Sequence, residues 1–94
     1  MARPLTVAEL AAHAGYSPRS FARHFLAETG MTPVRWLIAQ RLLEVRRLLE
    51  ATDLPVEEVA QRCGLGTAAN LRLHLAREAS TTPTAYRNAF RGTA

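Results

Sequence analysis

The chain has 94 residues, 48% of them apolar, and carries a formal net charge of +4. This length suits one small domain or two very small helical lobes. No apolar run could cross a bilayer, no signal-peptide pattern is present, and the single cysteine excludes an internal disulfide framework. All twelve basic residues are arginine, which suits bidentate recognition of phosphate and guanine. We therefore expect an anionic partner, and DNA, RNA and acidic proteins all fit that description.

A first short helix is predicted to begin after Thr6 and to end near Ala14. Thr6 and Glu9 have the spacing of a capping box, in which each side chain satisfies a backbone N–H of the other residue. Leu5 is placed to contact Leu10 as a hydrophobic staple. A turn that contains glycine then follows.

The second predicted helix carries two outward arginines. Ser17 is a favourable N-cap, Pro18 fits the first helical position, and Gly30 is a typical C-terminal stop. At the helical period, Arg19 and Arg23 lie one turn apart, on the side opposite two phenylalanines. A short helix, a tight glycine-containing turn and a helix with outward arginines form the helix-turn-helix pattern.

A third, longer helix is predicted to start at Pro33, with Thr32 as its cap, and to meet no breaker before residues 52–55. Its roughly nineteen residues would span about 28 Å. Trp36 and Leu43 form a second apolar strip nearly opposite the main one, so we expect the helix to pack between two bodies. The main apolar face comprises Val34, Leu37, Ile38, Leu42, Val45, Leu48 and Leu49.

The rest of the chain repeats the first part, which predicts a second helix-turn-helix unit. Three helices are expected near residues 56–63, 68–79 and 83–90, with Thr67 and Thr82 as caps. At an offset of 49, the recurring pairs are Leu5 and Leu54, Val7 and Val56, Glu9 and Glu58, Ala11 and Ala60, and Gly15 and Gly64. At an offset of 50, they are His24 and His74, Glu28 and Glu78, Thr32 and Thr82, and Pro33 and Pro83.

The repeat predicts an all-α chain with one DNA-binding domain over residues 1–94. Its parts are two helix-turn-helix units at residues 5–31 and 54–81, a linker helix at 32–51 and a C-terminal helix at 82–90. A rigid linker of this length could hold two recognition helices about 34 Å apart, roughly the distance between successive major-groove faces of B-DNA.

Together these features resemble the DNA-binding domain of the AraC/XylS family of bacterial transcription regulators, over residues 5–90. The most specific stretches are residues 53–60 (DLPVEEVA), 63–66 (CGLG) and 82–87 (TPTAYR). Two further stretches, residues 66–72 (GTAANLR) and 40–43 (QRLL), resemble the AdpA-like subgroup, whose regulators carry a DJ-1/PfpI-like N-terminal domain.

The resemblance implies seven helices in two lobes and sequence-specific binding to double-stranded DNA, with the third and sixth helices in adjacent major grooves. It also implies a bacterial cytoplasmic protein associated with the nucleoid, with RNA polymerase as a second partner and no cofactor in this domain. The parent would dimerise through a domain before Met1, whereas the fragment itself would be monomeric.

Candidate DNA contacts follow from the family by position. Leu73 stands where close relatives have arginine and aligns with Arg23, so the second unit has less polar capacity to read bases. Base contacts fall on Arg19, Ser20, Ala22 and Arg23 in the first unit, and on Ala68, Ala69, Asn70 and Leu73 in the second. Phosphate contacts fall on Ser17, Thr32, Arg35, Thr67, Arg72, Arg77 and Arg87. These four arginines could equally be plain surface charges, and the three hydroxyl residues are helix caps in either case.

Other polar residues favour structural roles. Arg41 lies within the apolar face of the long helix, and we expect a buried ion pair with Glu9, Glu28 or Glu58. His24 and His74 are predicted to be packing residues, because no spacing matches a metal site. Cys63 is expected in the core, and a lone cysteine without an activating base does not support alkyl-acceptor chemistry.

No nucleophile with its base, paired carboxylates or phosphate-cradling glycine loop is present, so we expect no enzymatic activity, catalytic residue or metal site. The alternative to DNA binding is a helical protein-interaction module, for example one that contacts RNA polymerase.

Overall fold

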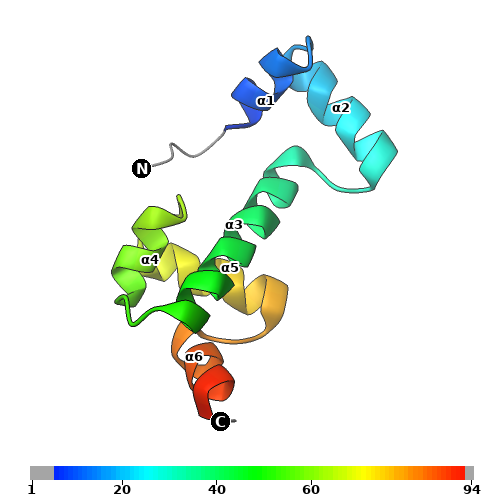
Figure 1. The fold of residues 1–94 in the computed structure, drawn as a ribbon. Helices are drawn as coiled ribbons and strands as arrows, with labels where there is room; N and C mark the ends of the chain where they lie inside the picture. Colours follow the sequence, from blue (N-terminus) through cyan, green and yellow to red (C-terminus); the bar gives the residue numbers. More distant parts are fainter. Residues whose placement is uncertain (1–5, 93–94) are drawn as a thin grey trace. The chain divides into compact units, whose positions relative to one another are not determined.

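Six helices make up the part of the chain that the computed structural model describes, residues 6–92 (Figure 1). They are α1 (Val7–His13), α2 (Pro18–Thr29), α3 (Pro33–Ala51), α4 (Val56–Arg62), α5 (Ala68–Ala79) and α6 (Pro83–Gly92). The all-α prediction is confirmed, but the seven helices implied by the family resemblance are a wrong count for residues 6–92. Consecutive helices are separated by at most five residues, which leaves no room for another helix between them. None of these helices is long and apolar enough to cross a membrane.

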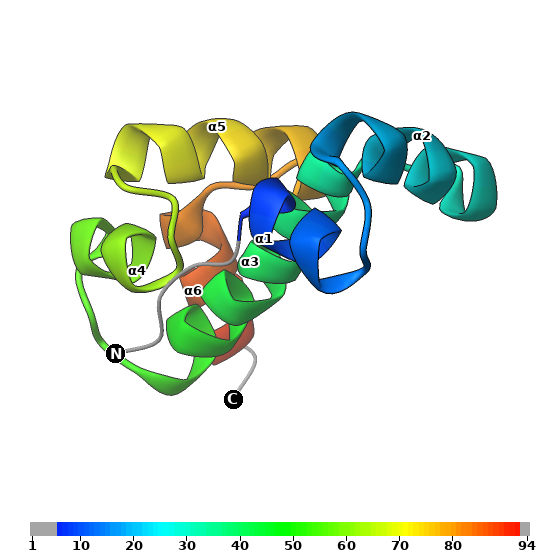
Figure 2. The same ribbon diagram turned by 90° about the horizontal axis from the view of Figure 1, so that it is seen from above.

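The chain divides into two compact units, and the division falls within α3. The N-terminal unit covers residues 2–40 and the C-terminal unit covers residues 41–94. In the first unit α1 packs against α2, and in the second α4 packs against α5 (Figure 2). Each pair is one of the two predicted helix-turn-helix units.

The helix starts of the N-terminal unit depend on side-chain caps. The Thr6 hydroxyl accepts the N–H of Glu9 at 3.1 Å, and the Ser17 hydroxyl accepts the N–H of Ser20 at 3.2 Å. At the other end of α2, Gly30 adopts the left-handed conformation, with φ of 76°, and closes the helix as predicted. The staple predicted for Leu5 lies outside the described residues.

Aromatic rings hold α2 within its unit. Tyr16, Phe21, Phe25 and Trp36 form a chain of neighbouring rings with centroids 6.5, 5.6 and 6.0 Å apart. These separations lie in the favourable range for aromatic pairs. The ring of His24 lies 4.9 Å from that of Tyr16, and both residues are exposed. No residue of α2 is fully buried, so the helix is held by partly covered rings.

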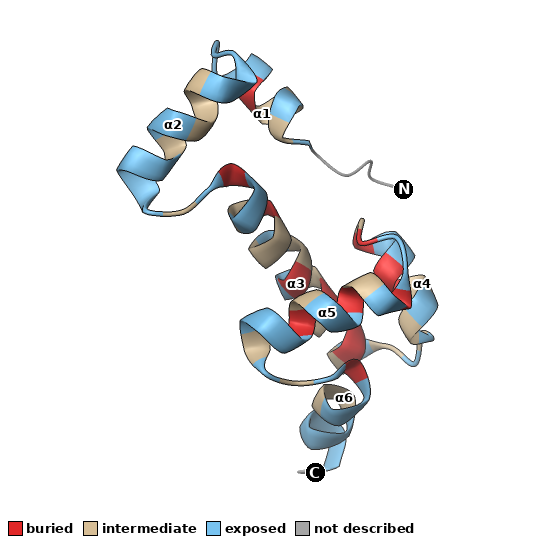
Figure 3. Ribbon diagram, turned by 180° about the vertical axis from the view of Figure 1, so that it is seen from behind, coloured by how far each residue is buried: buried red, intermediate tan, exposed pale blue. Residues whose placement is uncertain are grey.

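The C-terminal unit has a continuous apolar core, drawn in red on the second half of α3 and on α4 and α5 (Figure 3). It comprises Leu42, Val45, Leu48, Leu49, Val59, Ala60, Cys63, Leu65, Ala68, Leu71 and Leu75. Cys63 is therefore a core residue, as predicted. Arg41, at the start of this unit, donates from Nη1 to the carbonyl oxygen of Gly64 at 3.4 Å.

The long helix α3 begins and ends as predicted, and the Thr32 hydroxyl caps it by accepting the N–H of Arg35 at 3.2 Å. Its predicted apolar face is mostly covered, although Val34 in the first turn is exposed. In the second strip, Trp36 is partly covered by Phe25, whereas Leu43 is exposed. The strip is therefore covered only at the tryptophan.

Two arginines of α6 bind the C-terminal end of α3. Arg87 donates from Nε to the carbonyl of Leu49 at 3.2 Å, and Arg91 donates from Nη2 to the carbonyl of Thr52 at 2.6 Å. Arg91 also forms an ion pair with Asp53. Carbonyls at a helix C-terminus lack partners within the helix and attract cations, so both arginines are suited to these positions.

Candidate nucleic-acid interface

A line of three exposed side chains runs along α2, opposite its phenylalanine face. We call Arg19, Arg23 and Leu26 the α2 line. Ser17 and Pro18 fix the start of the helix, so the two guanidiniums occupy its first and second turns. The line presents two bidentate hydrogen-bond donors from a helix that follows a tight turn.

Ser20 and Ala22, the other base-contact candidates of the first unit, lie beside this line and are partly buried. The N–H of Ser20 is already bonded to the hydroxyl of Ser17. The exposed arginines therefore dominate the chemistry of this surface.

The equivalent line on α5 is apolar. At the repeat offset of 50, the positions of the α2 line become Ala69, Leu73 and Ala76, which we call the α5 line; all three are exposed. Two exposed arginines, Arg72 and Arg77, flank the line on either side. The arginines therefore lie along the centre of the exposed face in α2 and along its edges in α5.

Two predicted base contacts of the second unit have structural roles. Ala68 is 8% exposed, and its N–H donates to Oε2 of Glu57 at 3.2 Å, so its side chain belongs to the core. Asn70 is partly buried, and its Nδ2 donates to the carbonyl of Leu65 at 3.0 Å. Asn70 therefore connects the turn to α5, and one of its two amide protons is already bonded.

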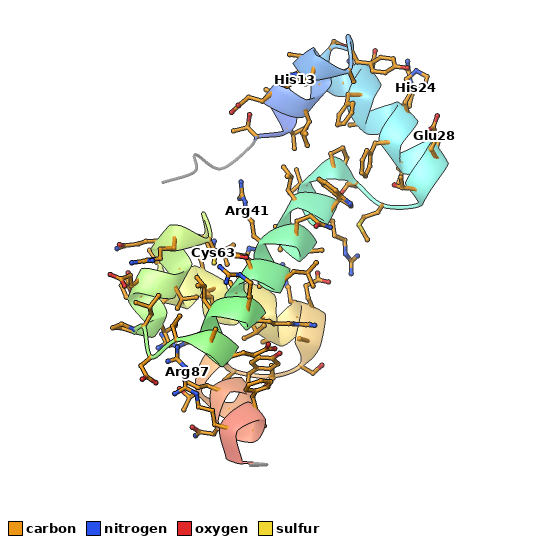
Figure 4. All side chains as sticks on the ribbon, in the orientation of Figure 1. His13, His24, Glu28, Arg41, Cys63 and Arg87 are labelled. Carbon is orange, nitrogen blue, oxygen red and sulfur yellow. The ribbon has the colours of Figure 1, made fainter. Side chains whose placement is uncertain are left out.

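The predicted phosphate contacts fall into three groups. The exposed residues Ser17, Thr32 and Thr67 cap helices, and the Thr67 hydroxyl accepts the N–H of Asn70 at 3.1 Å. The side chains of Arg35, Arg72 and Arg77 are also exposed. Arg87, by contrast, is partly buried beside the end of α3 (Figure 4) and binds the Leu49 carbonyl, so its guanidinium already has a structural partner.

Cys63 is not suited to nucleophilic chemistry. It is buried, and this burial raises the pKa of its thiol to about 11, because a thiolate would be poorly solvated there. The reactive thiolate is therefore scarce at neutral pH. Within residues 6–92, no group of three or more His, Cys, Asp or Glu side chains could hold a metal ion.

Comparisons with known proteins agree with this architecture. The profile of the helix-turn-helix domain family matches residues 10–89. An HTH-type transcriptional regulator of Mycobacterium tuberculosis is 42% identical over 84 residues, which are 89% of this chain and 32% of that protein. The HTH-type transcriptional activator RhaS of an Enterobacter species is 39% identical over 67 residues, 71% of this chain and 24% of that protein. The chain thus spans about a third or less of these relatives.

Solved structures are similar over nearly the whole chain. The DNA-binding domain of AdpA, a global transcriptional factor solved in complex with a target DNA, is 46% identical with a TM-score of 0.86, and the match covers 95% of this chain and 80% of that one. The C-terminal domain of AraT, a response regulator from Geobacillus stearothermophilus, is 27% identical with a TM-score of 0.82, over 90% of this chain and 70% of that one.

Proposed function

The chain belongs to the helix-turn-helix domain family, in its AraC-type form, and from this membership we propose that it binds double-stranded DNA sequence-specifically and regulates transcription. The observation that carries the proposal is the α2 line, because a capped helix after a tight turn exposes Arg19 and Arg23 one turn apart. Each guanidinium can bond two acceptors of guanine in the major groove.

The two units contribute unequally to this activity. We assign base reading to α2, through Arg19 and Arg23, with Ser20 and Ala22 beside them. A second major groove, successive to the first, receives α5, which presents Ala69, Leu73 and part of Asn70. The similarity to a domain solved with its target DNA supports this use of the two helices.

Contacts to phosphates position the helices without reading sequence. We assign them to the exposed arginines Arg35, Arg72 and Arg77 and to the caps Ser17, Thr32 and Thr67. Arg87 is assigned to the attachment of α6, because its Nε already binds the Leu49 carbonyl. The family and the fold are those of DNA-binding regulators, and no catalytic role is assigned.

The chain spans about a third of the mycobacterial relative. We propose that the parent protein acts in the bacterial cytoplasm and dimerises through a preceding regulatory domain, of the DJ-1/PfpI-like type in AdpA-like proteins. Contact with RNA polymerase belongs to the same proposal.

Selection of bound sequences from random duplexes tests the function directly. We expect one sharp half-site that contains guanine and a weaker half-site about one helical turn away. Each neutralised phosphate contributes about −0.9 to the log–log salt slope, so six contacts would give roughly −5. Arg62→Ala is a matched control for the loss of one charge, because Arg62 is exposed on α4, outside both lines, and should leave the selected sequence unchanged.

Absence of any enriched sequence, together with a flat response to salt, would contradict the proposal. That result would favour the helical protein-interaction module instead.

A further inference from the structure

The centre of the exposed face of α5 is a leucine. Leu73 is 51% exposed and lies opposite the buried residues Leu71 and Leu75 of the same helix. Single exposed leucines are common on protein surfaces, so exposure alone indicates little. What makes Leu73 informative is its position, because the repeat places it where α2 carries Arg23.

The polar groups near Leu73 do not supply the hydrogen-bond donors that Arg23 supplies at the equivalent position of α2. Asn70 is held by the Leu65 carbonyl, which restricts its reach toward a base edge. Arg72 and Arg77 flank the line, where guanidiniums are placed to meet the phosphates on the two sides of a groove. Between these cations lies a strip of methyl and isobutyl groups from Ala69, Leu73 and Ala76.

An apolar strip can distinguish bases in only one way. In the major groove, thymine is the one unmodified base whose edge carries a methyl group, whereas cytosine has only a hydrogen at C5 and the polar groups are hydrogen-bond donors and acceptors. The flanking arginines would bring such a strip onto the DNA, and a methyl group buried against it leaves water. The α5 surface, with arginines at its edges and apolar side chains along its centre, would therefore fit a major groove whose base edges carry methyl groups.

We propose, on the basis of the proposed function, that α5 reads the C5-methyl groups of pyrimidines, with Leu73 as the main contact and Ala69 and Ala76 beside it. The second half-site is then specified by methyl groups and the first by guanine. The chemistry of recognition is the methyl group itself, which thymine always carries and which cytosine carries only when methylated at C5. The two sources are distinguished by substitution in the DNA.

The first test changes only the DNA. Each thymine of the second half-site in a selected duplex is replaced by deoxyuridine, which removes the methyl group and preserves every hydrogen-bonding group. We expect affinity to fall about fourfold for each methyl group in contact, as for burial of one methylene. Replacement of cytosine by 5-methylcytosine next to Leu73 should raise affinity by a similar factor, because it adds the same methyl group at C5.

Protein variants then assign the effect to the α5 line. Leu73→Ala should bring the affinity ratio between thymine and deoxyuridine duplexes close to one. Arg77→Ala is the matched control, and it should weaken binding to both duplexes equally and keep the ratio. Because both side chains are exposed, neither variant is expected to unfold the domain.

The outcomes separate this inference from the proposed function. If no duplex is enriched, both fail. If enriched duplexes appear but their second half-site lacks thymine, or tolerates deoxyuridine without loss, DNA binding stands and methyl reading is wrong. Loss of the methyl effect in Leu73→Ala, with its retention in Arg77→Ala, supports the inference.

Discussion

The N-terminal and C-terminal units share one repeat but divide its tasks. In the first, α2 exposes two arginines and buries no residue fully, so partly covered aromatic rings hold it in place. In the second, α5 buries Ala68, Leu71 and Leu75 and presents an apolar line. Between these two copies of one motif, the exposed side chains and the packing differ separately, because they use opposite faces of one helix.

The largest expected difference concerns the cores. Leu75 is fully buried, and Leu75→Ala should cost about 2–5 kcal/mol of stability. Phe25 occupies the equivalent position in the first unit but is partly exposed, so Phe25→Ala should cost less and should loosen residues 6–40 selectively. Chemical denaturation with hydrogen exchange measures both effects. An equal or larger cost for Phe25→Ala would show that the first unit is as tightly packed as the second.

A second difference concerns base reading. Arg23→Ala should relax selectivity at one or two guanine positions of the first half-site, by about 1–3 kcal/mol at each. Arg77→Ala should instead lower affinity evenly across sequences, because a phosphate contact carries no sequence information. Quantitative binding to a panel of single-base variants measures both. An Arg23→Ala protein that keeps its full base preference would remove α2 from the role of main reader.

The ends of the two recognition helices differ by one residue type. Gly30 and Ser80 are equivalent C-caps in the left-handed conformation, but Ser80, with φ of 53°, carries the Cβ that disfavours it. Ser80→Gly should therefore stabilise the C-terminal unit by about 1 kcal/mol, and Gly30→Ser should destabilise the N-terminal unit by a similar amount. Thermal unfolding of both variants measures these changes, and effects of the same sign would contradict the argument.

The smallest expected effect belongs to the ion pair of α6. The guanidinium of Arg91 lowers the pKa of Asp53, first through a hydrogen bond and then through its charge. Because the pKa of Asp53 is lower in the folded state, the ion pair stabilises the C-terminal unit at pH values above the usual pKa of aspartate. This stabilisation is lost as the pH falls through the pKa of Asp53 in the folded state. Asp53→Asn should reduce the acid dependence of stability slightly, because the pair is exposed. An unchanged acid-unfolding curve would give the pair no role.

The sequence predicts the local structure well because its signals are local. The caps Thr6, Ser17, Thr32 and Thr67 act within three residues, and each makes the expected hydrogen bond to a backbone N–H. Helix periodicity likewise predicts the buried side of α3 and the exposed side of α2. The six helices were therefore predictable one by one from the residues, whereas the count of seven came from the family resemblance.

The contacts of site residues that the sequence did not predict join distant residues. The bond between Glu57 and Ala68 joins residues eleven positions apart, and the bond between Arg87 and Leu49 joins residues thirty-eight positions apart. No rule of local sequence spacing predicts either bond. One signal was available for Ala68, since it shares the apolar period of Leu71 and Leu75 and hence their buried face. The carbonyl partner of Arg41 had no comparable signal, because sequence patterns suggest carboxylates before backbone carbonyls.

The bond between Glu57 and Ala68 has no equivalent at the corresponding positions of the first unit, because the residues there cannot form it. Position 68 aligns with Pro18, which has no N–H, and Glu57 aligns with Ala8, which has no charge. The first unit removes the orphan donor at its helix start, whereas the second satisfies it with a carboxylate. The positive end of the α5 dipole is thus partly neutralised by a carboxylate of the same unit, whereas the first turn of α2 contains no acidic residue.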